Sequence, residues 1–304
     1  ELNNATYSDT AKEISFDKAF AGPGFFDLES KSYYSPNSLV PPAITGLLNG
    51  DALRAFKDNG IYYVCGDNTR PELVNNASSY HALRTTVAYN GFDGIVIIPR
   101  YATSIYYNVT TFAEEEYLFN TIYYNLPEVR GTWREIYALE VSRVTLQTLS
   151  LPPDAYMFHQ ANMRASDITQ AVQPYFPNGK FSLLMLWVEM VTESIRKRVN
   201  WPIVSRPMQE IVQIFLDREN RDTCGVKFAK LIKGNQLIGV QVTGGTKECP
   251  WPISVPGSVK GRDTVSAWKF EQLSPADPLT VWVPTKPNQT QTILLDPPVP
   301  WVMS

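Results

Sequence analysis

The first two thirds of the chain alternate between short apolar runs and longer amphipathic segments. Residues 61–65 and 95–98 are almost wholly apolar, as strands of a parallel sheet buried on both faces usually are. A third short strand is predicted over 155–158. Helical patterns are predicted over 112–124, 133–149, 183–198 and 208–221. Strands that alternate with helices favour an α/β fold with a parallel sheet or barrel.

Two further helices are predicted near the amino terminus from their capping residues. Ser8 can cap the first helix, and Asp51 can cap a second helix that stops at Asn59-Gly60. The second helix leads directly into the apolar run at 61–65, as expected of a helix followed by a strand.

Beyond residue 223 the pattern changes to short alternating runs, such as 237–243 and 279–283, divided by Gly and Pro. Ten of the 23 prolines lie from Pro250 onward. Because proline is confined to strand edges and turns, this part is predicted to be a small antiparallel β unit. We therefore expect an α/β domain over 1–223 and a β-sandwich-like tail over 224–304.

Composition and charge narrow the classes of partner. Of the 304 residues, 44% are hydrophobic and 19% charged, which suffices for a sizeable core. A formal charge of −3 and a pI near 5.6 provide no basic surface for phosphates, so nucleic acid is not an expected partner. No apolar run reaches the ~20 residues needed to cross a bilayer, so no membrane span is expected. Small molecules, glycans and proteins remain open as partners.

Cysteines and glycosylation triplets bear on the compartment. Cys224 and Cys249 flank a turn-rich β segment and either form a disulfide, leaving Cys65 unpaired, or all three are buried thiols. N-glycosylation triplets occur at Asn4-Ala5-Thr6, Asn76-Ala77-Ser78, Asn108-Val109-Thr110 and Asn288-Gln289-Thr290. Their number slightly exceeds chance and favours secretion. Glu1 is neither an initiator Met nor part of an apolar leader, so we expect a processed chain or a fragment.

His159 is the first candidate for chemistry. It ends the predicted strand at 155–158 and is followed by the polar side chains Gln160, Asn162 and Arg164. In this position it can face a cleft as a general acid or base. The alternative is a core histidine held by a backbone carbonyl.

Charged residues also follow the other two strands. Asp67 and Arg70 lie after the run at 61–65, and Arg100 lies after 95–98. Because ligand sites of α/β folds lie beyond the carboxyl ends of the strands, these groups can converge there. A guanidinium can orient a carboxylate or hold substrate oxygens, whereas the alternative is a structural salt bridge.

Tyrosines, most of them in adjacent pairs, offer surfaces on which sugar rings can stack, although ordinary packing is the alternative. They are Tyr33-Tyr34, Tyr101, Tyr106-Tyr107 and Tyr123-Tyr124. The sequence has no Gly-rich phosphate loop, Gly-x-Ser-x-Gly, His-Glu-x-x-His or Cys-x-x-Cys motif, which removes nucleotide enzymes, classical serine hydrolases and thiolate zinc sites.

Four segments together resemble a known family. They are Tyr34-Ser35-Pro36-Asn37-Ser38-Leu39-Val40, the run from Asn59-Gly60 to Arg70-Pro71, Ile98-Pro99-Arg100 with Tyr106-Tyr107-Asn108-Val109, and Met157-Phe158-His159-Gln160-Ala161-Asn162-Met163-Arg164. In this order they resemble the galactosaminogalactan deacetylase family of fungi and its bacterial relatives, which are secreted polysaccharide deacetylases distantly similar to the NodB type. The likeness spans essentially the whole chain.

The resemblance implies a distorted (β/α) barrel of the NodB type that holds a divalent metal, zinc in our interpretation. Family members bind the metal through an aspartate and a His-x-x-x-His pair, and we expect those ligands, with the catalytic base, upstream of Glu1. The barrel would then be incomplete in this chain, and the upstream part of the same polypeptide would be its partner.

The resemblance also assigns roles. His159 matches the late histidine that protonates the leaving amine, whereas Asp67 and Arg70 match a block that shapes the site. The block at Tyr34 to Asn37 lacks its usual arginine, so Arg70 or Arg100 is expected to replace it. We predict substrate contacts from Tyr34, Asn37, Asn68, Tyr101, Gln160, Asn162 and Arg164.

The function implied is metal-dependent hydrolysis of N-acetyl groups on hexosamine residues, of the GalNAc type, in an extracellular polysaccharide. The protein would be secreted, extracellular or in the cell wall. One alternative is a non-catalytic glycan-binding or structural module. Another is a glycoside hydrolase, for which the sequence shows no evident acidic pair beyond Asp67 and Asp93.

Overall fold

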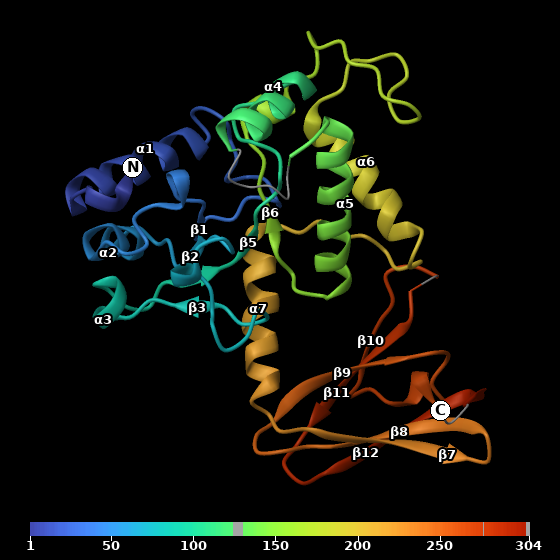
Figure 1. Cartoon of the computed structure of the whole chain (residues 1–304). Coiled ribbons are helices and arrows are strands. Elements are labelled where there is room, and N and C mark those ends of the chain that lie inside the picture. Colours follow the sequence, from blue (N-terminus) through green and yellow to red (C-terminus); the bar gives the residue numbers. More distant parts are fainter. Residues whose placement is uncertain (124–129, 276, 302–304) are drawn as a thin grey trace. The chain divides into compact units, whose positions relative to one another are not determined.

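The structure, a computed structural model, describes residues 1–123, 130–275 and 277–301 (Figure 1). The chain forms two compact units. Unit 1 comprises Glu1–Arg198 and Ser205–Leu216, and unit 2 comprises Val199–Val204 and Asp217–Ser304. The boundary expected between residues 223 and 224 stays a prediction.

Unit 1 contains a four-stranded sheet in the order β1-β2-β4-β3. Its strands are β1 (Ser38–Leu39), β2 (Tyr63–Cys65), β3 (Leu83–Arg84) and β4 (Val96–Ile98). The first two neighbouring pairs, β1 with β2 and β2 with β4, are parallel, and β3 is antiparallel to β4. Both apolar runs that the sequence marks as buried strands are therefore strands in the middle of this sheet.

Helices cover both faces of the sheet. Side chains of α1 (Tyr7–Ala21) and α2 (Gly50–Asp58) pack on one face, and those of α7 (Met208–Asp222), which continues into unit 2, pack on the other. The other α-helices described are α3 (Val87–Asn90), α4 (Phe112–Tyr117), α5 (Trp133–Leu149) and α6 (Leu183–Arg196). Successive side chains of a strand point to opposite faces. Accordingly, Ile97 packs in one core cluster with Phe56 of α2, whereas Val96 and Ile98 pack in another with Phe215 of α7.

The rest of unit 1 carries a second, two-stranded parallel sheet. Its strands are β5 (Arg100–Tyr101) and β6 (Ala155–Tyr156). The residues described thus form a mixed α/β unit with parallel strands, and their two sheets are not joined into a closed barrel. Short 3-10 helices complete the order: η1 (Leu2–Asn4), η2 (Pro42–Ile44), η3 (Pro71–Leu73), η6 (Gln160–Met163) and, in unit 2, η7 (Arg262–Thr264).

The residues that cap the amino-terminal ends of α1 and α2 differ from the predicted ones. The hydroxyl of Thr6 caps α1 by accepting a hydrogen bond from Asp9 N at 3.2 Å. The side chain of Asn49 caps α2 by accepting one from Asp51 N at 3.1 Å. The predicted caps Ser8 and Asp51 are wrong, because both lie one position or more inside their helices.

The helix predicted over 112–124 is also shorter than expected. It ends as an α-helix at Tyr117 and continues as a π-helical turn, η4 (Leu118–Ile122). Tyr124 lies outside the described residues. By contrast, α5 has the predicted bounds, and its first turn is closed by reciprocal hydrogen bonds between Thr132 and Glu135.

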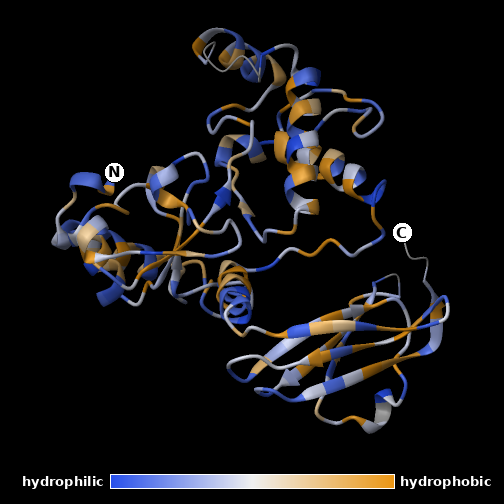
Figure 2. Cartoon of the chain, turned by 60° about the horizontal axis from the view of Figure 1, so that its bottom comes forward, coloured by the Kyte–Doolittle hydropathy of each residue, from blue (hydrophilic) through white to orange (hydrophobic). Residues whose placement is uncertain are grey.

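Unit 2 contains two three-stranded antiparallel sheets, as expected for the tail. Their strands are β7 (Lys227–Lys233), β8 (Gln236–Thr243), β9 (Cys249–Val255), β10 (Lys269–Glu271), β11 (Leu279–Thr285) and β12 (Thr290–Pro300), in the orders β10-β11-β9 and β12-β8-β7. Buried and half-buried residues alternate along β11, and polar and apolar colours alternate along the strands in Figure 2. Val281 and Ile293, one from each sheet, belong to the same core.

A disulfide joins Cys224 and Cys249, while Cys65 is a buried free thiol. Of the two alternatives that the sequence left open, the structure therefore has the disulfide with Cys65 unpaired and not three buried thiols. In the described part of the chain, no helix is both long and apolar enough to span a membrane.

Candidate functional site

A cavity of about 710 Å³ in unit 1 brings together residues that follow different strands. Arg70 lies after β2, Arg100 opens β5 directly after β4, and His159 lies after β6. The segment after β5 adds Ala102, Thr103, Ile105, Tyr106 and Tyr107 to the lining. Three of the four predicted catalytic side chains therefore face one space, as the strand-end rule implies.

Asp67, the fourth, is not part of the cavity lining, but its carboxylate contacts both arginines. Its side chain is 4% exposed, and Oδ2 accepts a hydrogen bond from Nη2 of Arg100 at 2.8 Å. Nε of Arg70 lies 3.6 Å from the same oxygen. Oδ1 accepts hydrogen bonds from the backbone N and hydroxyl of Thr69, at 2.9 and 2.7 Å. Both oxygens are thus occupied by donors.

These donors set the charge of Asp67. Burial alone would raise the pKa of the Asp67 carboxyl, but the hydrogen bonds from Thr69 and the adjacent charge of Arg100 outweigh it. The pKa of Asp67 therefore lies below its ordinary value, and the group is a carboxylate at neutral pH.

Gly66 allows this arrangement. A Cβ atom there would lie 2.7 Å from Cγ2 of Ile97 and 2.9 Å from the carbonyl oxygen of Leu73. Its backbone N instead donates to the Ile98 carbonyl oxygen at 2.7 Å, which continues the β2–β4 pairing up to Asp67.

Arg70 connects Asp67 to another wall of the cavity. Nη1 donates to the carbonyl oxygen of Ile44 at 2.9 Å, and Nη2 to that of Ala43 at 3.1 Å. Both acceptors belong to η2 and line the cavity. Arg70 therefore holds the backbone of η2 in place at the cavity, and it also brings a positive charge to the cavity lining.

His159 and Arg100 each present a polar atom without a partner. Nδ1 of His159 and Nε of Arg100 are buried and make no hydrogen bond with the residues described. Burial lowers the pKa of His159, and the Arg100 charge lowers it further. The imidazole is therefore mainly neutral at pH 7, and the ring of Tyr107 packs edge-on against it at 5.7 Å between centroids.

Asn162 has a structural role that the sequence did not reveal. It is fully buried, and Nδ2 donates to the carbonyl oxygens of Tyr106 and Val109, at 2.8 and 2.9 Å. Its Oδ1 accepts from the backbone N of His159 at 2.9 Å. Asn162 thereby links the general-acid candidate to the segment that lines the cavity.

The cavity lining includes none of the seven residues predicted to contact substrate, which are Tyr34, Asn37, Asn68, Tyr101, Gln160, Asn162 and Arg164. Asn37 donates to the Gly60 carbonyl oxygen, and Asn68 accepts from Ala102 N. Arg164 pairs with Asp167 on the surface. Contact of these side chains with substrate stays a prediction.

Of the aromatic residues considered for sugar stacking, Tyr106 and Tyr107 line the cavity, and Tyr107 is 52% exposed. The hydroxyl of Tyr106 shares a hydrogen bond with that of Tyr123. Tyr106 is thus held in place while Tyr107 is accessible.

Sequence reasoning missed two fully buried glutamates, Glu115 and Glu140. Glu140 lies four residues after Ile136 and four before Val144, both buried, so a charge on the apolar side of α5 was the available signal. Glu115 stands among three consecutive glutamates and carries no such signal.

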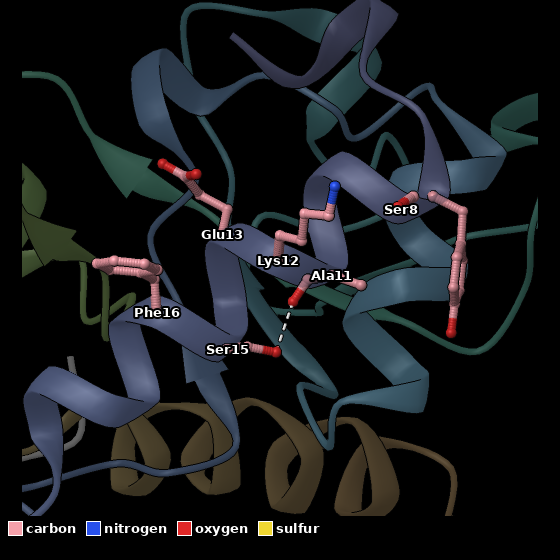
Figure 3. A pocket seen from close by; sticks show the side chains of 7 residues that line it. Ser8, Ala11, Lys12, Glu13, Ser15 and Phe16 are labelled. Carbon is pink, nitrogen blue, oxygen red and sulfur yellow. Dashed lines mark hydrogen bonds between the residues drawn. The ribbon is translucent and has the colours of Figure 1, made fainter.

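A second hollow, of about 610 Å³, runs along α1 (Figure 3). All its lining side chains, from Tyr7 to Phe16, belong to that one helix, and its drawn hydrogen bond runs from Ser15 to the Ala11 carbonyl oxygen. It gathers no groups from other elements and offers no chemistry.

The cavity residues do not fit a metal ion by themselves. No group of three His, Cys, Asp or Glu side chains able to hold one occurs among the residues described. The two arginines add positive charge beside His159, and the Asp67 oxygens already accept hydrogen bonds.

Comparisons with known proteins agree with this architecture. The family model described as the Agd3 deacetylase domain matches residues 1–229. A solved structure described as "Crystal structure of Agd3 a novel carbohydrate deacetylase" superimposes with a TM-score of 0.87 at 36% sequence identity. The match covers 99% of this chain but 44% of that one, so the chain spans less than half of its solved relative. No curated protein matches the chain. The expected resemblance is confirmed, and the chain belongs to the Agd3 deacetylase domain family.

Proposed function

We propose that this chain contributes to a polysaccharide deacetylase that hydrolyses N-acetyl groups on hexosamine residues of the GalNAc type. Family membership supports the reaction class. The observation that carries the proposal is the pair of unpartnered buried atoms, His159 Nδ1 and Arg100 Nε, on residues that line one cavity. Buried polar atoms normally have partners, and a bound substrate would supply them.

In this proposal His159 handles the proton of the leaving group. Hydrolysis adds water to the amide carbonyl carbon and breaks the C–N bond, and the departing nitrogen must gain a proton. Because the lowered pKa keeps the imidazole neutral at pH 7, His159 first takes up the proton that the water loses as it adds to the carbonyl carbon, and then delivers it to that nitrogen.

Arg100 has the complementary role. Its Nε–H can donate to an oxygen of the sugar or the acetamide, while Nη2 remains bound to Asp67. A guanidinium fixed by a buried carboxylate presents its donors in a set direction. Asp67 thus orients Arg100 without touching substrate.

A divalent metal, zinc by expectation, belongs to the proposal only through residues outside this chain. When bound, it would polarise the acetamide carbonyl and activate water. We propose that its ligands lie in the upstream part of the same polypeptide, which is also the proposed partner of this unit.

We also propose that the protein is secreted and acts outside the cell or in the cell wall. The Cys224–Cys249 disulfide supports an oxidising compartment. The asparagines of all four glycosylation triplets are exposed, which is compatible with modification there.

A non-catalytic glycan-binding module is the second candidate, favoured by the exposed ring of Tyr107 at the cavity. Aromatic rings of this kind stack on sugars without any chemistry. The two functions differ in whether acetate is released.

The test measures acetate release from a GalNAc polymer by the complete natural protein, with and without a chelator. His159→Ala should lower the rate by about 10²–10⁴-fold, the usual contribution of a general acid or base. His81→Ala is the matched control, because His81 lies outside the cavity lining. An unchanged rate for His159→Ala would remove the assigned role. Binding without acetate release would favour the module, and new reducing ends without acetate would favour a glycosidase.

A further inference from the structure

The segment from 102 to 111 lines the cavity but has no regular structure of its own. β5 ends at Tyr101 and α4 begins at Phe112. Nevertheless, Tyr106 and Tyr107 of this segment face the cavity. Its path must therefore be fixed by side chains that bind its backbone groups.

Two of those side chains are the buried glutamates. Glu140 Oε2 accepts a hydrogen bond from Ser104 N at 2.9 Å. Glu115 Oε2 accepts one from Tyr106 N at 3.3 Å. Neither glutamate lines the cavity, so both act on it only through this segment.

Glu140 has the fuller set of partners. Its Oε1 accepts from the indole N–H of Trp187 on α6 at 2.9 Å. Arg143 donates through Nη1 to the hydroxyl of the same Ser104 at 3.1 Å, which places a positive charge in the cluster. Glu115 differs, because its Oε1 has no partner among the described residues.

Burial also decides the protonation state of Glu115. Burial, and then the charge of Glu140, raise the pKa of Glu115 to about 9. Glu115 is therefore a neutral acid at pH 7. Glu140 has different surroundings, because each of its oxygens accepts from an N–H donor and the guanidinium of Arg143 binds the same Ser104.

We propose that Glu140, assisted by Glu115, is a positioning residue that fixes the 104–106 backbone so that Tyr106 and Tyr107 meet a bound N-acetylhexosamine chain beside His159. The identity of the occupant rests on the proposed function, whereas the anchoring does not. Loss of the anchor should displace Tyr107 from His159, whose rings now lie 5.7 Å apart.

The experiment uses the two histidines as reporters. The ring NMR signals of His159 sense the neighbouring Tyr107 ring, whereas His81 serves as an internal reference in the same chain. Glu140→Gln should shift the His159 signals and leave those of His81 in place, because an amide group presents its N–H to one of the two donors. Glu115→Gln should shift them little, since a carboxamide is neutral like the protonated acid. Glu189→Gln, at an exposed position of α6, is the matched control.

Binding of an N-acetylgalactosamine hexamer is measured on the same variants. Glu140→Gln should weaken binding by about fivefold or more, as expected when the support of a binding group is lost. Glu140→Asp is measured as well, in case Glu140→Gln does not fold. It keeps the carboxylate but retracts it by one methylene, so it should weaken binding in the same direction by a smaller factor.

A folded Glu140→Gln or Glu140→Asp chain with unchanged His159 signals would overturn the anchoring. Equal effects of Glu115→Gln and Glu140→Gln would overturn the leading role of Glu140. If the unaltered chain fails to bind the hexamer, the proposed substrate is contradicted, and the His159 signals alone decide the anchoring.

Discussion

Replacing Arg100 with methionine should destabilise unit 1 by leaving Asp67 buried without its main partner. The Asp67 side chain is 4% exposed, and removal of one partner from a buried pair costs about 3–5 kcal/mol. The bonds from Thr69 remain, and Arg70 stays 3.6 Å away. We therefore expect the free energy of unfolding to fall by an amount at or just below the lower end of that range, about 2–3 kcal/mol at pH 7.

The same substitution should change the dependence of stability on pH. The folded-state pKa of Asp67 is lowered, so its contribution is present above the unfolded value of about 3.9 and is lost as pH falls through the folded value. The difference between the unaltered chain and Arg100→Met should be constant from neutral pH down to about pH 5. It should shrink as Asp67 becomes protonated at lower pH.

Urea unfolding followed by the helix signal measures both effects, since the described α-helices lie mainly in unit 1. A double-mutant cycle with Asp67→Asn isolates the pair. Arg54→Met is the matched control, because the Arg54–Asp51 pair is half exposed and worth under about 1 kcal/mol. Equal losses for Arg100→Met and Arg54→Met, or a difference independent of pH, would refute the reasoning.

Three further predictions concern the cysteines and His159. Reduction of the Cys224–Cys249 disulfide should lower the stability of unit 2 by about 3 kcal/mol, the entropy expected for a loop of this size, and a thermal scan with unchanged melting would contradict it. Cys65 should resist iodoacetamide in the folded chain, because burial raises its pKa to about 11, and rapid labelling seen by mass spectrometry would show that the thiol is accessible. The His159 signals should titrate below the ordinary 6.5, and Arg100→Met should move the midpoint upward; a midpoint above 6.5 in the unaltered chain would contradict the assigned burial.

Much of the central sheet could be predicted from the sequence, because strands buried on both faces are apolar throughout. The runs at 61–65 and 95–98 contain the strands β2 (Tyr63–Cys65) and β4 (Val96–Ile98), and both are followed by charged residues that meet. Helix starts were harder to predict, since Ser8 and Asp51 have favourable cap chemistry but lie inside their helices. Which polar residue caps a helix depends on where the preceding chain turns.

The site was predictable only where residues follow strands. Asp67, Arg70 and Arg100 meet because the parallel strands β2 and β4 end at the same edge of their sheet, which can be inferred from the strand order alone. His159 follows β6, which pairs with β5 in the second sheet. The roles of Asn162 and Glu140 depend on segments about 36 to 56 residues away in sequence. No local pattern shows such pairings, so the hydrogen bonds of Asn162 and Glu140 could not be predicted, and substrate contact by Asn162 stays a prediction.

Part of what ties down the segment between β5 and α4 is a set of hydrogen bonds to its main-chain N–H and C=O groups. Hydrogen bonds to the main chain do not depend on which side chain a residue carries. Proline at 104 or 106 is the exception, because it would lack the N–H that donates. Positions 103 and 107, whose side chains are not buried, can therefore exchange those side chains without rerouting the loop, whereas Ile105 is buried and is also held by packing. The side chains that face the cavity can thus change while the scaffold beneath stays the same.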